Sequence, residues 1–285
     1  MPHLQDPIPH NRWSRHLITG NLRLSLQTPA GQFVSPATGR LTLTSKGPQE
    51  LIAQEASRIQ GVPVIPGSGI KGAVRSLYEL LSFSCDPLGG NRCKPGSCCD
   101  ACTLFGALGR AGRAGFGDAK PAGPEFVRVE VQEVPIPWPP QKPEGDVSLY
   151  DFQEAKQFDR DRKVFVTQPK ELSREVFSGR FETRMTFWNA TREELGRLLL
   201  SMGIGEGDTT RFLLRLGGVK YDGKGAVEVQ PRELTLVAGA SRKNYDEPAC
   251  RKECSDWIAA AKSAPWASTF WPKLEEVATL LRGPF

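Results

Sequence analysis

Cysteine is the residue type whose spacing most clearly indicates chemistry in this chain. Five of the seven cysteines lie in the eighteen-residue stretch CDPLGGNRCKPGSCCDAC. Cys99 and Cys102 have the spacing of one zinc knuckle, and Cys85 and Cys93 can supply the second pair, although the gap between them is wider than usual. Four thiolates are the usual ligand set of a structural zinc ion and leave no open coordination position. The sequence therefore predicts a structural Zn2+ site at these four cysteines.

Two alternatives stay open for this stretch. Cys98 can replace Cys99 as a ligand, because the two are adjacent. Residues 84–106 can also form a surface loop with reduced cysteines, but their polar, glycine- and proline-rich composition cannot pack by itself, which favours a metal. The other cysteines, Cys250 and Cys254, are four residues apart on an expected helix. Two ligands make a poor metal site, so half-buried thiols are the better interpretation.

A second stretch, VPVIPGSGIKGAVR, contains a G-x-G-x-x-G pattern at residues 67–72. That pattern is the fingerprint of a dinucleotide-binding turn. Such a turn follows a strand directly and has an acidic residue about 20 positions later. Here Pro63 and Pro66 flank the loop, and Leu88 and Gly89 occupy the later positions. A nicotinamide or flavin cofactor is therefore not favoured.

The same stretch still favours binding of a phosphate. Glycines let the backbone come close to a ligand, and the N–H groups at a helix start attract anions. Ser68 and Gly69 lie where a helix is expected to begin, with Ser68 as its cap. Lys71 and Arg75 are four residues apart and share one helix face. The alternative is a glycine turn that caps a core helix and carries two solvated basic residues.

A third stretch, LRLGGVKYDGKGAVEV, combines glycines and lysines between two expected strands. Its glycines and lysines are Gly217, Gly218, Lys220, Gly223, Lys224 and Gly225. A flexible hairpin is the alternative interpretation. Two basic, glycine-rich loops that each join a strand to its successor favour one shared track for a polyanion.

Composition and charge narrow the class of protein. The chain has 285 residues, of which 39% are hydrophobic and 24% charged, and its formal net charge is +5. These values suit a globular protein and permit a polyanionic partner. All three histidines lie in the first sixteen residues, which disfavours histidine catalysis inside the fold. No apolar run reaches the length of a membrane span, and MPHLQDPIPHNRWSRH lacks the apolar segment of a signal peptide. A cytoplasmic protein with no membrane partner is expected.

Hydrophobic periodicity indicates the elements that must position these residues. Strands are expected near 17–27, 126–134 and 178–188, and helices at 72–83, at 192–202 behind a capping box, and from about Asp256 and Pro272. The order fits a β-α-β-β-α-β plan, which is an α+β fold of the ferredoxin-like (RRM) type. Residues 1–285 are expected to form one domain, in which the proline-rich and charged middle region is an arm, a hairpin or a solvated loop.

The stretches VIPGSGIKGAVRSLYE, CTLFG, GFGDA and LGGVKYDGKGAVEV follow one another in this order. Together they resemble the RAMP superfamily of CRISPR-associated proteins. More narrowly, they are similar to the backbone subunits of type III and related effector complexes. The matching blocks cover about residues 61–119 and 178–231.

The resemblance implies a ferredoxin-like palm with a zinc-binding insertion at 84–106, like those of type III-D subunits, and a thumb-like insertion at 128–176. It also implies that the two glycine loops bind RNA. The residues concerned here are Ser68, Gly69, Lys71, Arg75, Gly217, Gly218, Lys220, Gly223, Lys224 and Gly225. The implied partners are crRNA, target RNA, copies of the chain in a head-to-tail stack, and other effector subunits.

The chain departs from the target-cleaving members of this family in one loop. Those members carry an aspartate after the first strand, whereas residues 28–40 contain no Asp or Glu. A subunit that binds RNA and leaves cutting to a separate nuclease, as in type VII systems, is therefore expected. The alternative is a RAMP endoribonuclease that cuts target or processes guide. For a guide processor His16 is the candidate residue, and a solvated histidine is the competing interpretation.

Overall fold

Strand β1 (Ile18–Gln27) lies at the centre of the fold. The computed structural model describes residues 12–46, 49–85, 93–94, 96–123, 126–135, 156–159, 164–167, 171–220, 223–265 and 267–281. Antiparallel to β1 run β13 (Glu171–Ala190) on one side and β15 (Ala226–Ala238) on the other. The short β8 (Ala114–Phe116) pairs with the other edge of β13. The resulting order is β15-β1-β13-β8, with α1 (Gly67–Leu80) between β1 and β8 in sequence and α3 (Arg192–Ser201) between β13 and β15.

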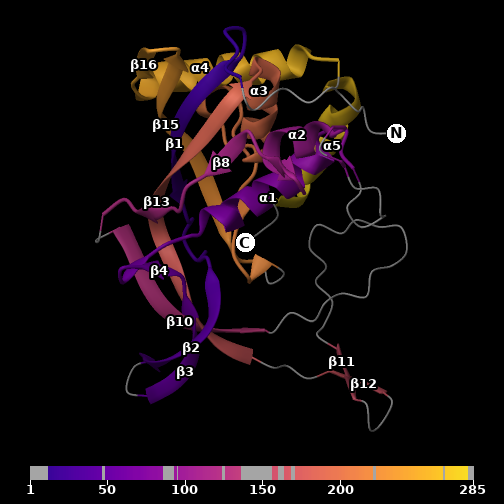
Figure 1. Ribbon diagram of the computed structural model, residues 1–285. Coiled ribbons are helices and arrows are strands. Elements are labelled where there is room, and N and C mark those ends of the chain that lie inside the picture. Colours follow the sequence, from indigo (N-terminus) through magenta and orange to yellow (C-terminus); the bar gives the residue numbers. More distant parts are fainter. Residues whose placement is uncertain are drawn as a thin grey trace.

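The core lies between this sheet and a layer of helices, which Figure 1 shows on one side of β1 and β15. Leu22, Leu24 and Leu26 are buried, because alternate residues of a strand point to the same face. Helices α1 and α3 bury one face against the same cluster. Two C-terminal helices, α4 (Glu247–Ser263) and α5 (Ala267–Leu281), extend the helical layer, and Trp257 of α4 is fully buried.

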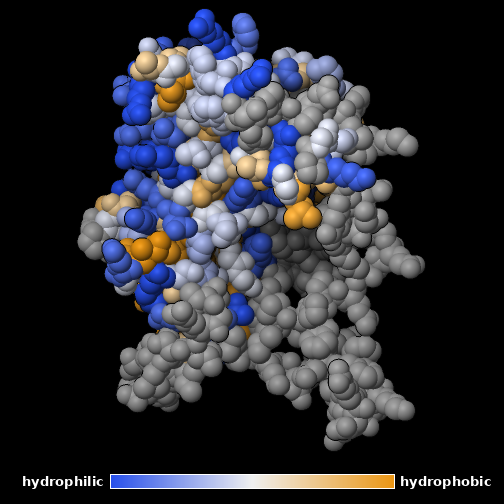
Figure 2. Space-filling view, in the orientation of Figure 1, coloured by the Kyte–Doolittle hydropathy of each residue, from blue (hydrophilic) through white to orange (hydrophobic). Residues whose placement is uncertain are grey.

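The edge of the sheet at β16 has a different character. Strand β16 (Ser241–Tyr245) pairs with β15, and mainly hydrophilic residues cover the surface around these two strands (Figure 2). Four consecutive residues of β16, from Ser241 to Asn244, are exposed. The sheet is therefore covered by helices on one side and exposed to solvent around β16, as is common for antiparallel sheets.

Beyond the central sheet, β13 continues into a second group of strands. Strand β10 (Val127–Pro135) pairs with residues 171–179, so the excursion at 128–176 begins and ends as an antiparallel pair. Strand β3 (Gln49–Ala56) also contacts β13 and pairs with β2 (Ala37–Lys46). Within the excursion, β11 (Lys156–Asp159) and β12 (Val164–Thr167) form a separate two-stranded sheet. The rest of the segment 128–176, where a thumb-like insertion is expected, lies outside the described residues.

The other elements are short. They are β4 (Arg58–Ile59), β5 (Val62–Pro63), α2 (Asp100–Phe105), β6 (Gly106–Ala107), β7 (Arg110–Ala111), β9 (Lys120–Pro121), the 3-10 helix Glu206–Asp208 and β14 (Leu214–Arg215). Within the described part of the chain, no helix is long and apolar enough to cross a membrane.

The α+β class is confirmed, as is the capping box of Thr191 and Glu194 at the start of α3. Three local predictions are wrong. Helix α1 begins at Gly67 with Pro66 as its N-cap and no side-chain cap, so Ser68 lies inside the helix and does not cap it. Helix α4 begins well before Asp256, because Asp246 caps it. The thiols of α4, Cys250 and Cys254, are fully buried, not half-buried.

Candidate metal centre and nucleic-acid interface

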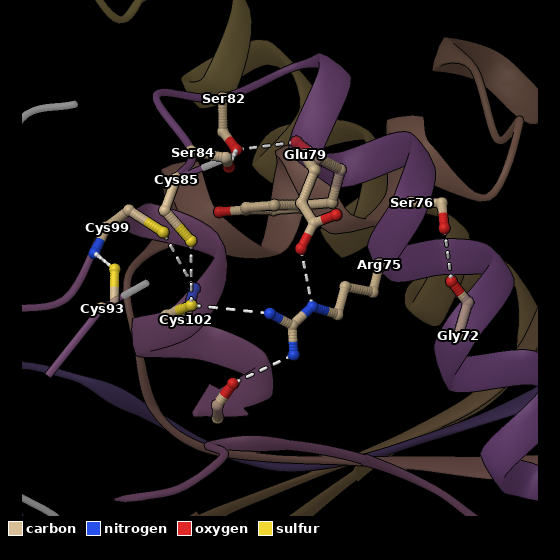
Figure 3. Close-up of polar contacts among 12 residues, drawn as sticks. Gly72, Arg75, Ser76, Glu79, Ser82, Ser84, Cys85, Cys93, Cys99 and Cys102 are labelled. Carbon is tan, nitrogen blue, oxygen red and sulfur yellow. Dashed lines mark hydrogen bonds and ion pairs between the residues drawn. The ribbon is translucent and has the colours of Figure 1, made fainter. Parts of the chain in front are cut away.

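The four cysteines named from their spacing meet in one cluster. The Sγ atoms of Cys85, Cys93, Cys99 and Cys102 all lie within 4.8 Å of one another, and those of Cys85 and Cys102 are 3.7 Å apart. A tetrahedral zinc ion with Zn–S bonds of about 2.3 Å separates its sulfurs by about 3.8 Å. The cluster therefore has the donor set and the size that a zinc ion requires, and Figure 3 shows the sulfurs converging.

Local backbone geometry orients two of these thiols. Cys99 is the N-cap of α2, and its Sγ accepts a hydrogen bond from the N–H of Cys102, 3.4 Å away. The N–H of Cys99 in turn donates to the Sγ of Cys93 at 3.1 Å. Cys98 is arranged differently, because its thiol donates to the carbonyl of Lys94 at 3.1 Å and it is not part of the four-sulfur cluster. The geometry therefore places Cys99, and not Cys98, in the four-sulfur cluster.

The pKa values of these thiols are shifted in opposite directions. The hydrogen bond from the Cys102 side chain, helped by the backbone N–H of Cys102, lowers the pKa of Cys99 well below its ordinary value. The pKa of Cys102 is raised, chiefly by the same contact with Cys99. Burial raises the pKa of Cys93 to about 11. Closely spaced thiols cannot all ionise unless a cation compensates their charge, which is what a bound metal does.

Buried arginines tie α2 to the core. Arg197 of α3 binds Asp100 with an Nη1–Oδ2 distance of 2.6 Å. The fully buried side chain of Arg113 donates to the carbonyl of Thr103 at 3.1 Å and forms an ion pair with Glu194. Residues 101–105 are buried as well. Residues 98–99 and 101–105 are therefore buried, and the surface-loop alternative is wrong for them, whereas Lys94 and Gly96 are exposed.

The start of α1 packs tightly against the strand that follows it. A Cβ on Gly67 would lie 2.2 Å from the carbonyl oxygen of Phe116, so only glycine fits there. The N–H of Gly67 donates to the Oδ1 of Asp118 at 2.8 Å. This carboxylate already occupies the first N–H of the helix. Asp118 was missed by our sequence reasoning, although the GDA stretch contains it.

The outer face of α1 is different, because small residues leave it open. Ser68, Gly69 and Gly72 are exposed, and a Cβ on either glycine would meet nothing within 4 Å. Lys71 is half-buried beside them, and burial together with the charge of Arg75 lowers its pKa. Lys71 and Arg75 therefore lie close together, as predicted, but the Arg75 guanidinium turns toward the cysteines (Figure 3).

The late glycine loop packs against the segment that follows β1. Gly217 has a φ of +86°, and a Cβ there would lie 2.8 Å from the backbone of Ser35. The N–H of Gly218 donates to the carbonyl of Ser35, and that of Gly225 to the carbonyl of Phe33, both at 2.9 Å. These three glycines therefore serve close backbone packing within the protein.

The lysines of this loop are placed beside the same segment. Lys224 lies over the Phe33 ring, 5.7 Å from its centroid. Burial lowers the pKa of Lys220. Gly223 has a φ of +66° and open space around it. The loop is thus joined to residues 33–35, which lie within the segment 28–40 that follows β1.

Comparison with known proteins gives the family. No curated protein matches the chain in sequence. The cryo-EM structure of the type III-B Cmr-beta bound to cognate target RNA is similar to it, at 18% sequence identity and a TM-score of 0.38, over 79% of this chain and 62% of that one. The chain thus spans less than two thirds of the length of the matched chain. The family model of the RAMP superfamily matches residues 28–228. The protein belongs to the RAMP superfamily.

Proposed function

We propose that this protein is an RNA-binding backbone subunit of a CRISPR effector complex, which grips the phosphates of crRNA and presents target RNA. Membership of the RAMP superfamily supports this function. The observation that carries it is the outer face of α1, where Ser68, Gly69 and Gly72 are exposed beside Lys71. Glycine inside a helix is unfavourable by about 1 kcal/mol relative to alanine. Because no neighbouring atom requires these two glycines, a close approach from outside the chain accounts for them.

The architecture that presents this face is, in our proposal, a ferredoxin-like palm in a single domain. The strand order β15-β1-β13-β8 with α1 and α3 as the connecting helices supports it. The paired strands β10 and β13 are proposed as the base of a thumb-like insertion at 128–176. Arg58 supports this base by a bidentate ion pair with Glu175, at 2.6 and 3.0 Å.

The contacts to RNA are proposed to come from two sets of residues. The first is the α1 set, Ser68, Gly69 and Lys71. The second is the late loop, in which Gly223, Lys220 and Lys224 would contact phosphates while Gly217, Gly218 and Gly225 hold the loop in place. Since Asp118 occupies the first N–H of α1, side chains and the open helix face, more than the helix start, would supply the phosphate contacts.

The metal is proposed to be a structural zinc ion held by Cys85, Cys93, Cys99 and Cys102. When bound, it supplies a tetrahedral cross-link with no open position for substrate. The chain's own contribution is to orient the thiols through α2 and its backbone N–H groups. A zinc insertion of this kind suggests a type III-D-like or type VII-like effector.

No nuclease activity is proposed for this subunit. Residues 28–40 contain no acidic residue, and cutting would fall to a separate nuclease among the partner subunits. Copies of the chain would stack head to tail along the guide.

A RAMP endoribonuclease stays the alternative to a non-catalytic subunit. A guide-bound complex incubated with target RNA and magnesium distinguishes these two functions. Cleavage at regular intervals would refute the non-catalytic proposal.

The direct test of RNA binding is purification followed by a salt titration. A short RNA is expected to co-purify, and the affinity should fall steeply with salt, because phosphate contacts release counterions. Replacing one phosphate-binding lysine, as in Lys71→Met, should reduce the slope of log K against log salt by about 0.7. Replacing the exposed Lys252 on α4 is the matched control and should leave the slope unchanged. A protein free of RNA, with no affinity for any single strand, would overturn the proposal.

A further inference from the structure

The guanidinium of Arg75 makes three contacts inside the protein. Its Nε donates to the Oε1 of Glu79 at 2.7 Å, and its Nη1 donates to the carbonyl of Gly106 at 3.0 Å. Its Nη2 donates to the Sγ of Cys102 at 3.5 Å. Figure 3 shows the side chain reaching from α1 toward the sulfur cluster. The three partners come from α1 itself, from α2 and from the strand that follows α2.

Charge explains why a metal centre of this kind needs such a residue. Four thiolates and one zinc ion carry a net charge of −2, and Cys99 and Cys102 are buried. Burying uncompensated charge is costly. A guanidinium that donates to a thiolate offsets part of this charge and also restrains the direction of the sulfur lone pairs. Outer contacts of this type typically change metal affinity by about ten- to a hundredfold.

We propose that Arg75 is a positioning residue of the metal centre, which holds the Cys102 thiolate toward the ion and fastens α2 to α1. This inference rests on the metal site proposed above. It differs from the role expected from the sequence, in which Arg75 contacts RNA phosphate together with Lys71. Glu79 contributes by orienting the guanidinium, since its carboxylate binds the Nε edge while the other edges reach Cys102 and Gly106.

Other roles for Arg75 account for fewer of its contacts. An exposed pair with Glu79, four residues later on the same helix, would explain the Nε contact alone. A phosphate contact would require the guanidinium to face solvent, but its side chain is only 31% exposed. The contacts at Cys102 and Gly106 join Arg75 to residues far along the chain, at α2 and its C-cap, and Cys102 is a member of the sulfur cluster.

The test is the rate at which zinc leaves the full-length protein for a chromogenic chelator. Arg75→Met should release zinc about ten- to a hundredfold faster than the wild type. Arg75→Lys keeps the charge but cannot reach three partners at once, so its release rate should be intermediate. Lys71→Met is the matched control: it removes a charge one turn earlier on α1, and among the described residues Lys71 makes no hydrogen bond to a cysteine. Its release rate should equal that of the wild type.

A spectroscopic readout separates positioning from a general loss of stability. In cobalt-substituted protein, loss of the hydrogen bond to Cys102 should shift the thiolate-to-metal charge-transfer band to longer wavelength in Arg75→Met, and by a smaller amount in Arg75→Lys. Wild-type release rates and an unshifted band would overturn the inference. If Arg75→Met does not fold, the zinc release rate and the cobalt band of Arg75→Lys test the inference in its place. A wild-type protein that binds neither zinc nor cobalt would instead overturn the metal site itself.

Discussion

Cys98 and Cys99 are adjacent and equally buried, yet they differ in their contacts. The Sγ of Cys99 is in the four-sulfur cluster, and that of Cys98 donates to a backbone carbonyl. We expect Cys99→Ser to lose zinc and to unfold at a lower temperature, because a structural zinc contributes folding free energy directly. Cys98→Ser keeps its hydrogen bond and should retain about one zinc per chain. Elemental analysis and thermal unfolding of both variants measure this, and zinc loss from Cys98→Ser alone would reverse the ligand assignment.

Glu175 provides a second residue-level prediction, in which pH is the variable. Burial by itself would raise the pKa of this carboxyl, but the hydrogen bonds from Arg58 and from the N–H of Ala56 overcome it and hold the pKa below its ordinary value. A depressed carboxyl pKa stabilises the fold above the unfolded pKa of about 4.3, and this contribution is lost as the pH falls through the folded value.

The measurement is the free energy of unfolding across pH for the wild type and Glu175→Gln. The variant should be less stable by about 1–3 kcal/mol near neutral pH, as for other hydrogen bonds to charged groups. The difference should shrink in acid below about pH 4. A difference that stays constant over the whole range would show that Glu175 acts through packing and not through its charge.

Helix α1 illustrates how an element can be stabilised at the expense of its function. Gly72 is exposed within the helix, and a Cβ there meets no other atom. Gly72→Ala should therefore raise the free energy of unfolding by about 0.5–1 kcal/mol, while it weakens RNA binding by keeping the RNA backbone away. Ser76→Ala, one turn later on the same face, is the control, because it adds no bulk. Calorimetry and an RNA-binding titration measure the two effects. An RNA affinity that is unchanged in Gly72→Ala would contradict the proposal that RNA approaches this face of α1 closely.

The start of the same helix depends on a residue far along the chain. Asp118 accepts the N–H of Gly67 at 2.8 Å across 51 residues of sequence. Asp118→Ala should destabilise the fold by about 1 kcal/mol, since it removes a carboxylate that acts as a cap at the positive end of the helix. Asp118→Asn keeps an acceptor oxygen and should cost less. Equal unfolding temperatures for all three proteins would show that this contact is not stabilising.

The central elements were predictable from the sequence, because their patterns are local. Alternation indicated β1 and the C-terminal half of β13, and a capping box indicated α3. The cysteine spacing indicated the members of the four-sulfur cluster, although only the geometry separates Cys99 from Cys98. The direction of Arg75 could not be read from the sequence, because it depends on Cys102, 27 residues away. Contacts of this range are set by tertiary packing, which no local pattern encodes.

At the scale of the whole molecule, the fold has two distinct parts, the helical side of the central sheet and the β10–β13 strand pair. The helical side carries the core, the cysteine cluster and the open face of α1, while β13 extends out of the central sheet to pair with β10. The head-to-tail association proposed above would use two different surfaces of each copy, and the helical side and the β10–β13 pair would offer two such surfaces. The modest net charge of +5 is consistent with phosphate contacts confined to one track.

Head-to-tail stacking predicts that guide length determines the number of bound copies. A heterologous interface does not close on itself, so copies would add along an RNA until its free length is used. Mass photometry of the protein with single-stranded RNAs of increasing length should show complexes whose mass rises in steps of one chain. RNAs shorter than one binding site should capture no copy, and Lys71→Met should require lower salt to reach the same steps. A complex with one copy at every RNA length would rule out stacking while leaving RNA binding itself intact.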